Sequence, residues 1–181
     1  AVARGDFRVL DEERAAELYE ATVARLAAAG LADYEISNFA KAGQESRHNL
    51  TYWRYGDYVG VGPRAHGRLT LGGDKFATRQ HRAPEAWLDL VERDGHATRQ
   101  RDLVPRGERR NEMLMMGLRL KEGVPLVRVA DESALPFAQA IDATRLERLI
   151  DGGFLALSGD RLSATSSGRQ RLDAVLAMLI A

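Results

Sequence analysis

Residues 40–68 place the strongest limit on the fold of this chain, because neither a helical nor a strand pattern runs through them. The segment reads AKAGQESRHNLTYWRYGDYVGVGPRAHGR and contains five glycines, Trp53 and three tyrosines. Glycines interrupt the regular spacing of helices and of strands. Long irregular segments carry function more often than structure, so we expect binding residues here.

The region before this segment predicts one helix followed by one strand. Asp11 is a suitable N-terminal cap, apolar residues recur after it at helical spacing, and Gly30 ends the pattern. Residues 31–39 alternate as in a strand. A helix that leads into a strand through a short loop predicts one repeat of a parallel sheet and an α/β fold class. Because the chain opens on Ala1, we also expect it to be a piece of a longer protein.

Two glycines flank Val61 near the end of the irregular segment. Gly60 and Gly62 would allow the backbone to approach a ligand closely, although the spacing does not complete a GxGxxG motif. His66 follows, and a lone histidine in a loop is more often a satisfied polar group than a ligand. The residues alone therefore assign no role to this turn.

Residues 69–110 predict a hairpin, a helix and a junction. Two short strand-like runs on either side of Gly72 and Gly73 predict the hairpin over 69–78, and a helix is expected from Pro84 to Gly95. Residues 97–110 contain five arginines and few apolar side chains. Such a stretch could meet phosphate, but we interpret it as a solvated linker between domains.

The C-terminal region predicts a small module of helices and one hairpin. Helices are expected at 113–123, 126–130 and 137–149, followed by a hairpin over 154–164 and a final helix capped by Thr165. This order resembles a winged helix. Its second helix carries mixed charges, so it lacks the cationic stripe of a groove-reading helix. The methionines near residue 115 fit an adaptable core better than a metal site.

The composition is that of an ordinary globular protein without a general affinity for polyanions. Lys+Arg and Asp+Glu both number 26, whereas binding to nucleic acid or an anionic membrane needs a cationic excess. There is no cysteine, which excludes disulfides and thiolate metal sites. No apolar run approaches the roughly 20 residues of a transmembrane segment. We therefore expect a cytoplasmic protein.

Several motifs occur together in the order and spacing of a known family. They are Tyr34-Glu-Ile-Ser-Asn-Phe-Ala, His48-Asn-Leu-Thr-Tyr-Trp, Gly56-Asp-Tyr-Val-Gly-Val-Gly and Ala65-His66. From about residue 10 to its end, the chain resembles the HemW family, the radical-SAM haem chaperones related to oxygen-independent coproporphyrinogen III oxidase. The later Gly117-Leu-Arg-Leu and the winged module are similar to the C-terminal domain of that group.

The resemblance implies the C-terminal half of a longer protein. Residues 1–98 would be the last part of a radical-SAM barrel, a partial TIM-like barrel, and residues 99–181 a small helical winged-helix-like domain. The family holds a 4Fe-4S iron-sulfur cluster on three cysteines and uses S-adenosylmethionine. This chain has no cysteine, so the cluster and its radical chemistry are expected only in the full-length parent, and the chain alone is not expected to be an enzyme.

The resemblance also implies two sets of site residues. The HNxxYW motif is the suggested haem-binding site and comprises His48, Asn49, Tyr52 and Trp53. Neutral imidazole is the usual axial ligand of haem iron, so His48 is the expected ligand. The turn that is similar to the segment approaching S-adenosylmethionine comprises Gly60, Gly62, Ala65 and His66. Two positions depart from the expected pattern: Arg64 replaces a glycine, and Ser46 stands where some members have cysteine.

The resemblance implies haem binding and delivery to recipient haem proteins. It leaves open the oxygen-independent coproporphyrinogen III oxidase activity, an anaerobic oxidative decarboxylation, although the HNxxYW motif favours the chaperone. Binding of nucleic acid by the winged module is a third hypothesis, which the neutral charge disfavours. From the residues alone, His48 and Asn49 could equally be loop side chains bonded to backbone. A severed barrel leaves open strand edges, which would allow a homodimer.

Overall fold

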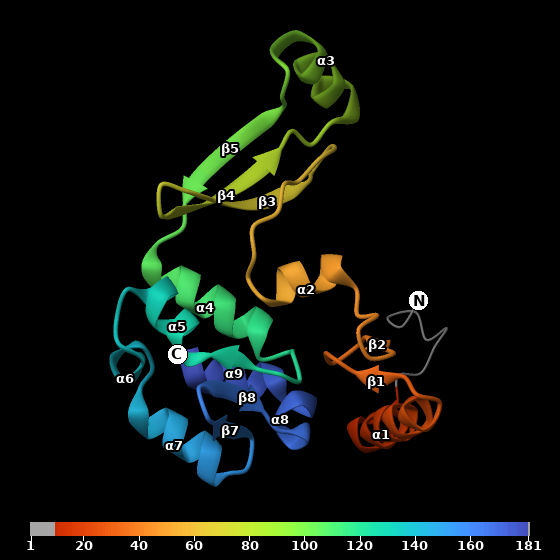
Figure 1. The fold of residues 1–181 in the computed structure, drawn as a ribbon. Coiled ribbons are helices and arrows are strands. Elements are labelled where there is room, and N and C mark those ends of the chain that lie inside the picture. Colours follow the sequence, from red (N-terminus) through yellow and green to blue (C-terminus); the bar gives the residue numbers. More distant parts are fainter. Residues whose placement is uncertain (1–9, 181) are drawn as a thin grey trace. The chain divides into compact units, whose positions relative to one another are not determined.

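The computed structural model describes residues 10–180, and their contacts divide the chain into two compact units between Ser46 and Arg47 (Figure 1). The first unit holds α1 (Glu12–Ala28), β1 (Ala32–Asp33) and β2 (Phe39–Ala40). The side chain of Asp11 accepts a hydrogen bond from the Arg14 N–H, which confirms the predicted cap and helix.

The single strand predicted over 31–39, and the parallel repeat built on it, are wrong. β1 and β2 pair with each other in antiparallel fashion, and a tight turn joins them. The buried carboxylate of Glu35 accepts hydrogen bonds from the Ser37 N–H and from the side-chain amide of Asn38. A carboxylate that binds groups of its own loop favours a turn over an extended strand, and an alternating pattern does not reveal this.

The second unit begins with α2 (Arg47–Trp53) and a three-stranded antiparallel sheet. Its strands, in the order β3–β4–β5, are β3 (His66–Leu71), β4 (Asp74–Gln80) and β5 (Thr98–Leu103), and α3 (Pro84–Asp94) connects the last two. Gly72 and Gly73 have φ angles of 61° and 87° in the turn of the predicted hairpin. Gly95 ends α3 in the left-handed region, as expected.

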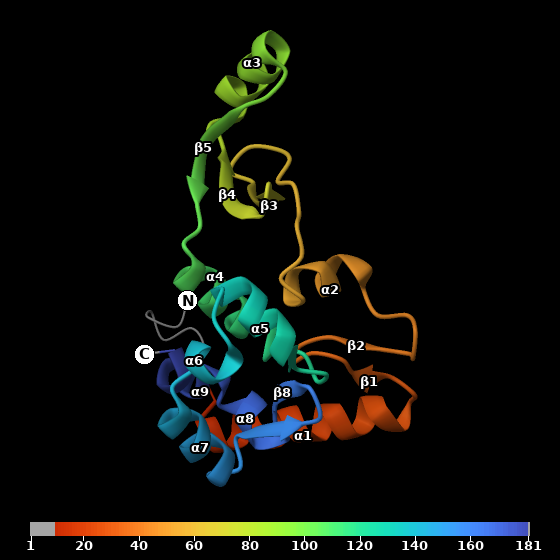
Figure 2. The same ribbon diagram turned by 60° about the vertical axis from the view of Figure 1, so that its left-hand side comes forward.

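The interpretation of 97–110 as a solvated linker is wrong for most of its length. Residues 98–103 form β5 and pair with β4, although all six are exposed. Because neither face of β5 is buried, its sequence carries no alternation of apolar and polar residues that would predict a strand. The predicted domain boundary between residues 98 and 99 lies within this strand and stays a prediction. Figure 2 shows the chain leaving the sheet through β5 into the helical region.

The helical region contains a second small sheet. The elements are α4 (Arg106–Gly117), β6 (Val124–Pro125), α5 (Leu126–Ser133), α6 (Phe137–Ala140), α7 (Ala143–Asp151), β7 (Leu155–Ser158), β8 (Arg161–Ala164), α8 (Ser166–Gln170) and α9 (Leu172–Ile180). The three strands pair in the order β6–β8–β7, all antiparallel. The expected hairpin and the order of helices around it are present. The winged-helix comparison itself stays a prediction.

Two predicted helices are each broken into two. Ile141 is extended and Asp142 caps α7 through the Arg145 N–H, so the helix expected over 137–149 is split. The final helix, whose Thr165 cap is confirmed, breaks at Arg171 before α9. The core of this region contains Leu118, Val129 and Leu162, which expose no surface, together with Met113. The prediction that the methionines are core residues holds for Met113 but not for Met115, which is 46% exposed.

Candidate functional site

The HNxxYW motif forms α2, where it makes two pairs of residues four positions apart. Residues four apart lie on one side of a helix, so His48 pairs with Tyr52 and Asn49 with Trp53. The rings of His48 and Tyr52 meet edge to face with centroids 4.8 Å apart, and Tyr52 in turn packs on Tyr58 at 4.3 Å. His48 is exposed and Tyr52 half-buried. Three of these rings therefore form one cluster with an accessible imidazole.

Trp53 belongs to a different environment. It lines a pocket of about 220 Å³ together with Met113, Leu120 and Val124 of the helical region. The guanidinium of Arg119 lies over its ring at 4.5 Å, and its buried Nε1 has no hydrogen-bond partner. The structure thus brings together two of the four predicted haem-binding residues and places Trp53 as an anchor of α2. Asn49 is half-buried and already interacts with another group of the protein.

The glycine turn packs against the chain itself. Tyr58 and Arg68 exchange backbone hydrogen bonds of 2.8 and 3.0 Å. Gly60 lies two residues after Tyr58, and a Cβ added to it would overlap the carbonyl of His66. Gly60 is therefore required by the close approach of its own backbone to β3. Gly62 has a φ of 102° in open surroundings, a conformation that favours glycine.

Ala65 and His66 lie where this turn enters the sheet. The Ala65 carbonyl accepts a hydrogen bond of 2.9 Å from the Gln80 N–H, and His66 stands opposite Arg79 as the first residue of β3. His66 is exposed and lines a pocket of about 370 Å³. Arg64 precedes them with a φ of 66°, which is uncommon for a residue with a side chain.

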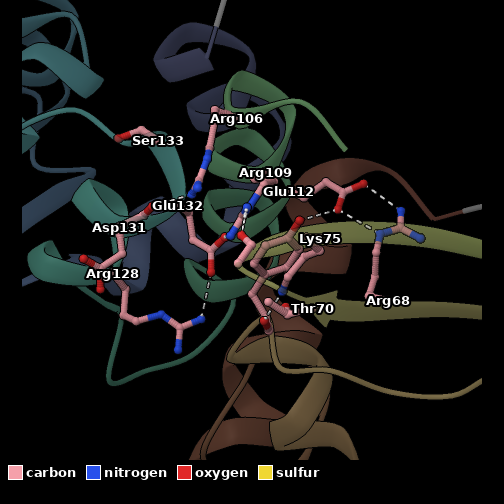
Figure 3. Close-up of polar contacts among 12 residues, drawn as sticks. Arg68, Thr70, Lys75, Arg106, Arg109, Glu112, Arg128, Asp131, Glu132 and Ser133 are labelled. Atoms are coloured by element: carbon pink, nitrogen blue, oxygen red, sulfur yellow. Dashed lines mark hydrogen bonds and ion pairs between the residues drawn. The ribbon is translucent and has the colours of Figure 1, made fainter. Parts of the chain in front are cut away.

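A buried polar network joins the sheet to α4 (Figure 3). The carboxylate of Glu112 accepts hydrogen bonds from the hydroxyl of Tyr55 at 2.7 Å and from Arg68 at 2.7 and 3.0 Å. Lys75 exposes only 2% of its surface, donates to the Tyr55 carbonyl at 2.9 Å and lies 3.7 Å from the centre of the Tyr55 ring. Asp57 adds a carboxylate oxygen 3.6 Å from its Nζ.

Burial and hydrogen bonding shift the pKa of Tyr55 in the same direction and the pKa of Glu112 in opposite directions. Burial raises the pKa of the Tyr55 hydroxyl, and the neighbouring Glu112 carboxylate raises it further. Burial also raises the pKa of Glu112, but the hydrogen bonds from Arg68 and Tyr55 outweigh it, so the pKa lies below its ordinary value. Burial lowers the pKa of Lys75, which favours its neutral form.

A second buried pair continues the network into α5. Nη2 of Arg109 lies 2.7 Å from Oε2 of Glu132, and Arg128 reaches the other oxygen of Glu132 at 3.3 Å. Arg109 also donates to the Gly73 carbonyl in the hairpin turn at 3.0 Å. None of Lys75, Glu112 and Glu132 is a predicted site residue. The only signal for this network in the sequence is an isolated lysine in a β-hairpin, and a lone lysine does not show which residues it contacts.

The family comparisons agree with the order of the motifs. Residues 104–171 match the family described as the HemN C-terminal domain. Over 99% of its length the chain is 37% identical to a radical S-adenosyl methionine domain-containing protein 1, mitochondrial, of Bos taurus, and 33% identical to the heme chaperone HemW of Mycobacterium tuberculosis. It is 31% identical to heme chaperone HemW of Escherichia coli over 94% of its length. The chain therefore matches the C-terminal half of HemW-like proteins.

This HemW-like chain spans about two fifths of its curated relatives: 42% of the bovine protein and 43% of the mycobacterial protein. Among solved structures it resembles the coproporphyrinogen III oxidase HemN of Escherichia coli, described as a radical SAM enzyme. The TM-score is 0.62 at 16% identity, covering 88% of this chain and 39% of that one. That likeness concerns the fold, and the α/β fold class is confirmed.

The residues of the HemW-like chain do not fit an iron-sulfur cluster. The sequence has no cysteine, so it offers no thiolate ligand. Within residues 10–180, no group of three or more His, Asp and Glu side chains is placed to hold a metal ion. A single histidine ligand to a porphyrin iron needs no such group, and His48 meets that simpler requirement.

Proposed function

We propose that the protein containing this HemW-like chain binds haem and delivers it to recipient haem proteins, with His48 as the axial ligand of the iron. The observation that carries the proposal is the exposed imidazole of His48 packed against Tyr52, which packs on Tyr58. An accessible neutral imidazole can ligate iron, and neighbouring aromatic rings can pack on the porphyrin face. The relatives named heme chaperone support the same role.

Within the motif, the ligand-binding part is the pair His48 and Tyr52. Trp53 faces the pocket between α2, α4 and β6, where Arg119 covers its ring. We therefore assign it to holding α2 in place, and through α2 the orientation of the imidazole. Asn49, which is also predicted to bind haem, lies on the same side of α2 as Trp53. It already interacts with another group of the protein.

A haemin titration followed through the Soret absorption band tests the proposal. The expected result is a saturable spectral change that His48→Ala abolishes and that added imidazole restores. His96→Ala is the matched control, because His96 is the other exposed histidine outside both sites and should leave the titration unchanged. A His48→Ala protein that titrates like the unaltered chain would contradict the assignment. Far-ultraviolet circular dichroism checks that each variant is folded.

The oxidase activity is the alternative. Only the fold likeness to HemN favours it, and fold alone does not transfer an activity. S-adenosylmethionine and the 4Fe-4S cluster would be contributed by the whole protein, and contact of Gly60, Gly62, Ala65 and His66 with S-adenosylmethionine stays a prediction. Product analysis of coproporphyrinogen III incubated with full-length protein, reductant and S-adenosylmethionine distinguishes the two functions. Decarboxylated product would favour the oxidase.

Location and assembly stay predictions as well. Within residues 10–180, no helix combines the length and the apolar character that crossing a bilayer requires. Three matched relatives, from Bos taurus, Mus musculus and Danio rerio, are described as mitochondrial, so a cytoplasmic location does not follow from the family. A homodimer and the absence of nucleic-acid binding remain expectations of the sequence.

A further inference from the structure

The pocket beside His66 concentrates positive charge in a chain whose net charge is zero. Its volume is about 370 Å³, and no carboxylate lines it. The lining consists of four guanidinium groups, one imidazole and two side-chain amides: Arg64, Arg79, Arg82, Arg99, His66, Gln80 and Gln100.

These arginines lack counter-ions in the part of the chain that the structure describes. Several other arginines of the second unit have carboxylate partners, as Arg68 has in Glu112 and Arg109 in Glu132. Within residues 10–180, none of the four pocket arginines has a side-chain hydrogen bond or ion pair. Like charges gathered in one concavity repel one another and attract an anion. Guanidinium groups bind carboxylates in a bidentate, directional manner, which suits such a ligand.

Strand register places two residues of this pocket, His66 and Arg79, on the same face of the sheet as the aromatic cluster. Tyr58 stands directly opposite Arg68, and residues opposite each other in an antiparallel pair project to the same face. His66 lies two residues before Arg68 on β3, so it shares that face, as does Arg79, which stands opposite His66. Two residues of strand span roughly 7 Å. The accessible rings and the cationic pocket are thus neighbours on one surface.

We propose that the pocket of Arg64, Arg79, Arg82, Arg99 and His66 binds the propionate carboxylates of a porphyrin whose macrocycle lies against Tyr58 and Tyr52. This inference rests on the proposed function for the identity of the ligand. A porphyrin with propionates on one edge offers a flat apolar body for the aromatic cluster and adjacent carboxylates for the arginines. Haem would then be held at two points, by its iron and by its propionates.

Three probes separate the two points of contact. Haemin has iron and two propionates, haemin dimethyl ester has iron without free carboxylates, and metal-free coproporphyrin has propionates without iron. The variants are R79Q and the double variant R64Q/R79Q. The control is R101Q, which removes the same charge from β5 on the opposite face, where Arg101 lies over the ring of Phe76.

The double variant should bind haemin and coproporphyrin at least roughly tenfold more weakly, which is the usual effect of losing hydrogen bonds to a charged group. Binding of the dimethyl ester should not change, and R101Q should behave like the unaltered chain with all three probes. The Soret band of bound haemin should keep its position in the double variant, because His48 still ligates the iron.

Each other outcome identifies which proposal fails. Equal affinity of the unaltered chain for haemin and its dimethyl ester would overturn the propionate site and leave haem binding intact. If the chain binds coproporphyrin through the arginines but His48→Ala does not alter haemin binding, the propionate site holds and the axial ligand is wrong. If inorganic phosphate at equal concentration displaces coproporphyrin completely, the pocket is a general anion site and the proposal is overturned.

Discussion

Arg109 of α4 and Glu132 of α5 form an ion pair with 2.7 Å between Nη2 and Oε2, and their side chains expose only 6% and 9% of their surface. Removing Glu132 leaves the Arg109 charge buried without its carboxylate, and removing Arg109 leaves the buried Glu132 with only the more exposed Arg128 at 3.3 Å. We therefore expect Arg109→Met or Glu132→Leu alone to lower the free energy of unfolding by about 3–5 kcal/mol. The double variant should recover most of that loss, because it buries no unpaired charge. Urea unfolding of the four proteins measures both effects.

An exposed pair provides the control for this prediction. Arg14 and Glu17 on α1 are 2.6 Å apart, but their side chains are more than half exposed. Because water solvates both charges, Glu17→Gln should change the free energy of unfolding by less than about 1 kcal/mol. If the losses of the two single variants added up in the Arg109/Glu132 double variant, an unpaired buried charge would not be the cause of the destabilisation.

Acid should destabilise the protein through Glu112. Burial raises the pKa of this carboxyl, but hydrogen bonds from Arg68 and Tyr55 lower it more, so its folded-state pKa lies below the ordinary value of 4.5. A lowered folded-state pKa contributes stability above 4.5 that is lost as the pH falls through the folded-state value. We expect Glu112→Gln to flatten the acid side of the stability profile measured by urea unfolding. Parallel profiles for the two proteins would contradict this.

Local signals in the sequence were enough for elements whose ends are marked by single residues. The cap at Asp11, the glycine turn of the first hairpin, the stop at Gly95 and the cap at Thr165 all appear where they were predicted. Each depends on a residue whose own backbone or side chain makes the feature, so neighbours in sequence carry the information.

The polar network could not be predicted, because its partners are far apart in sequence. Tyr55 lies 57 residues and Arg68 lies 44 residues from Glu112, and no periodic pattern relates such positions. β5 was missed for a different reason, since an exposed strand shows no apolar alternation. The HNxxYW motif is identified only through the family resemblance. Only the structure of α2 shows that His48 and Trp53 lie in different environments.

Gly60→Ala should strongly destabilise the second unit. An added Cβ would overlap backbone atoms of His66, which cannot move aside like a flexible side chain. Overpacking of this kind typically costs about 1–3 kcal/mol. Gly43→Ala is a useful comparison, because its φ of 77° imposes strain although no atoms lie nearby. Thermal unfolding should show a larger loss for Gly60→Ala, and a loss no larger than that of Gly43→Ala would contradict overlap with the His66 backbone as its cause.

Arg64→Gly should stabilise the fold. Arg64 has a φ of 66°, and a left-handed conformation costs a residue with a Cβ roughly 1–2 kcal/mol. Part of that gain is lost, because glycine increases the conformational entropy of the unfolded chain. This lowers the free energy of unfolding by about 0.4–1 kcal/mol. The net increase in the free energy of unfolding should therefore lie between about 0 and about 1.6 kcal/mol. Arg64→Ala, which loses the charge but keeps the Cβ, separates relief of strain from relief of repulsion among the arginines.

Within the HNxxYW motif, we expect Trp53 to contribute to stability and Tyr52 to contribute to haem binding. Trp53 packs beneath Arg119 at 4.5 Å in the pocket beside α4, whereas Tyr52 lies between His48 and Tyr58. Trp53→Ala should therefore lower the urea midpoint, with a loss in the free energy of unfolding of up to about 3 kcal/mol since the ring is only half-buried. Tyr52→Ala should weaken haemin binding with little effect on the midpoint, because it removes a ring that supports the imidazole and the porphyrin face.

Measuring both quantities in both variants gives a two-by-two comparison in which each protein controls for the other. Tyr52→Leu, which keeps apolar bulk without the aromatic ring, tests whether the ring itself is needed against the porphyrin. If Trp53→Ala weakened haemin binding at an unchanged urea midpoint, the whole motif would contact the ligand. α2 would then have to turn its Trp53 side toward the porphyrin on binding.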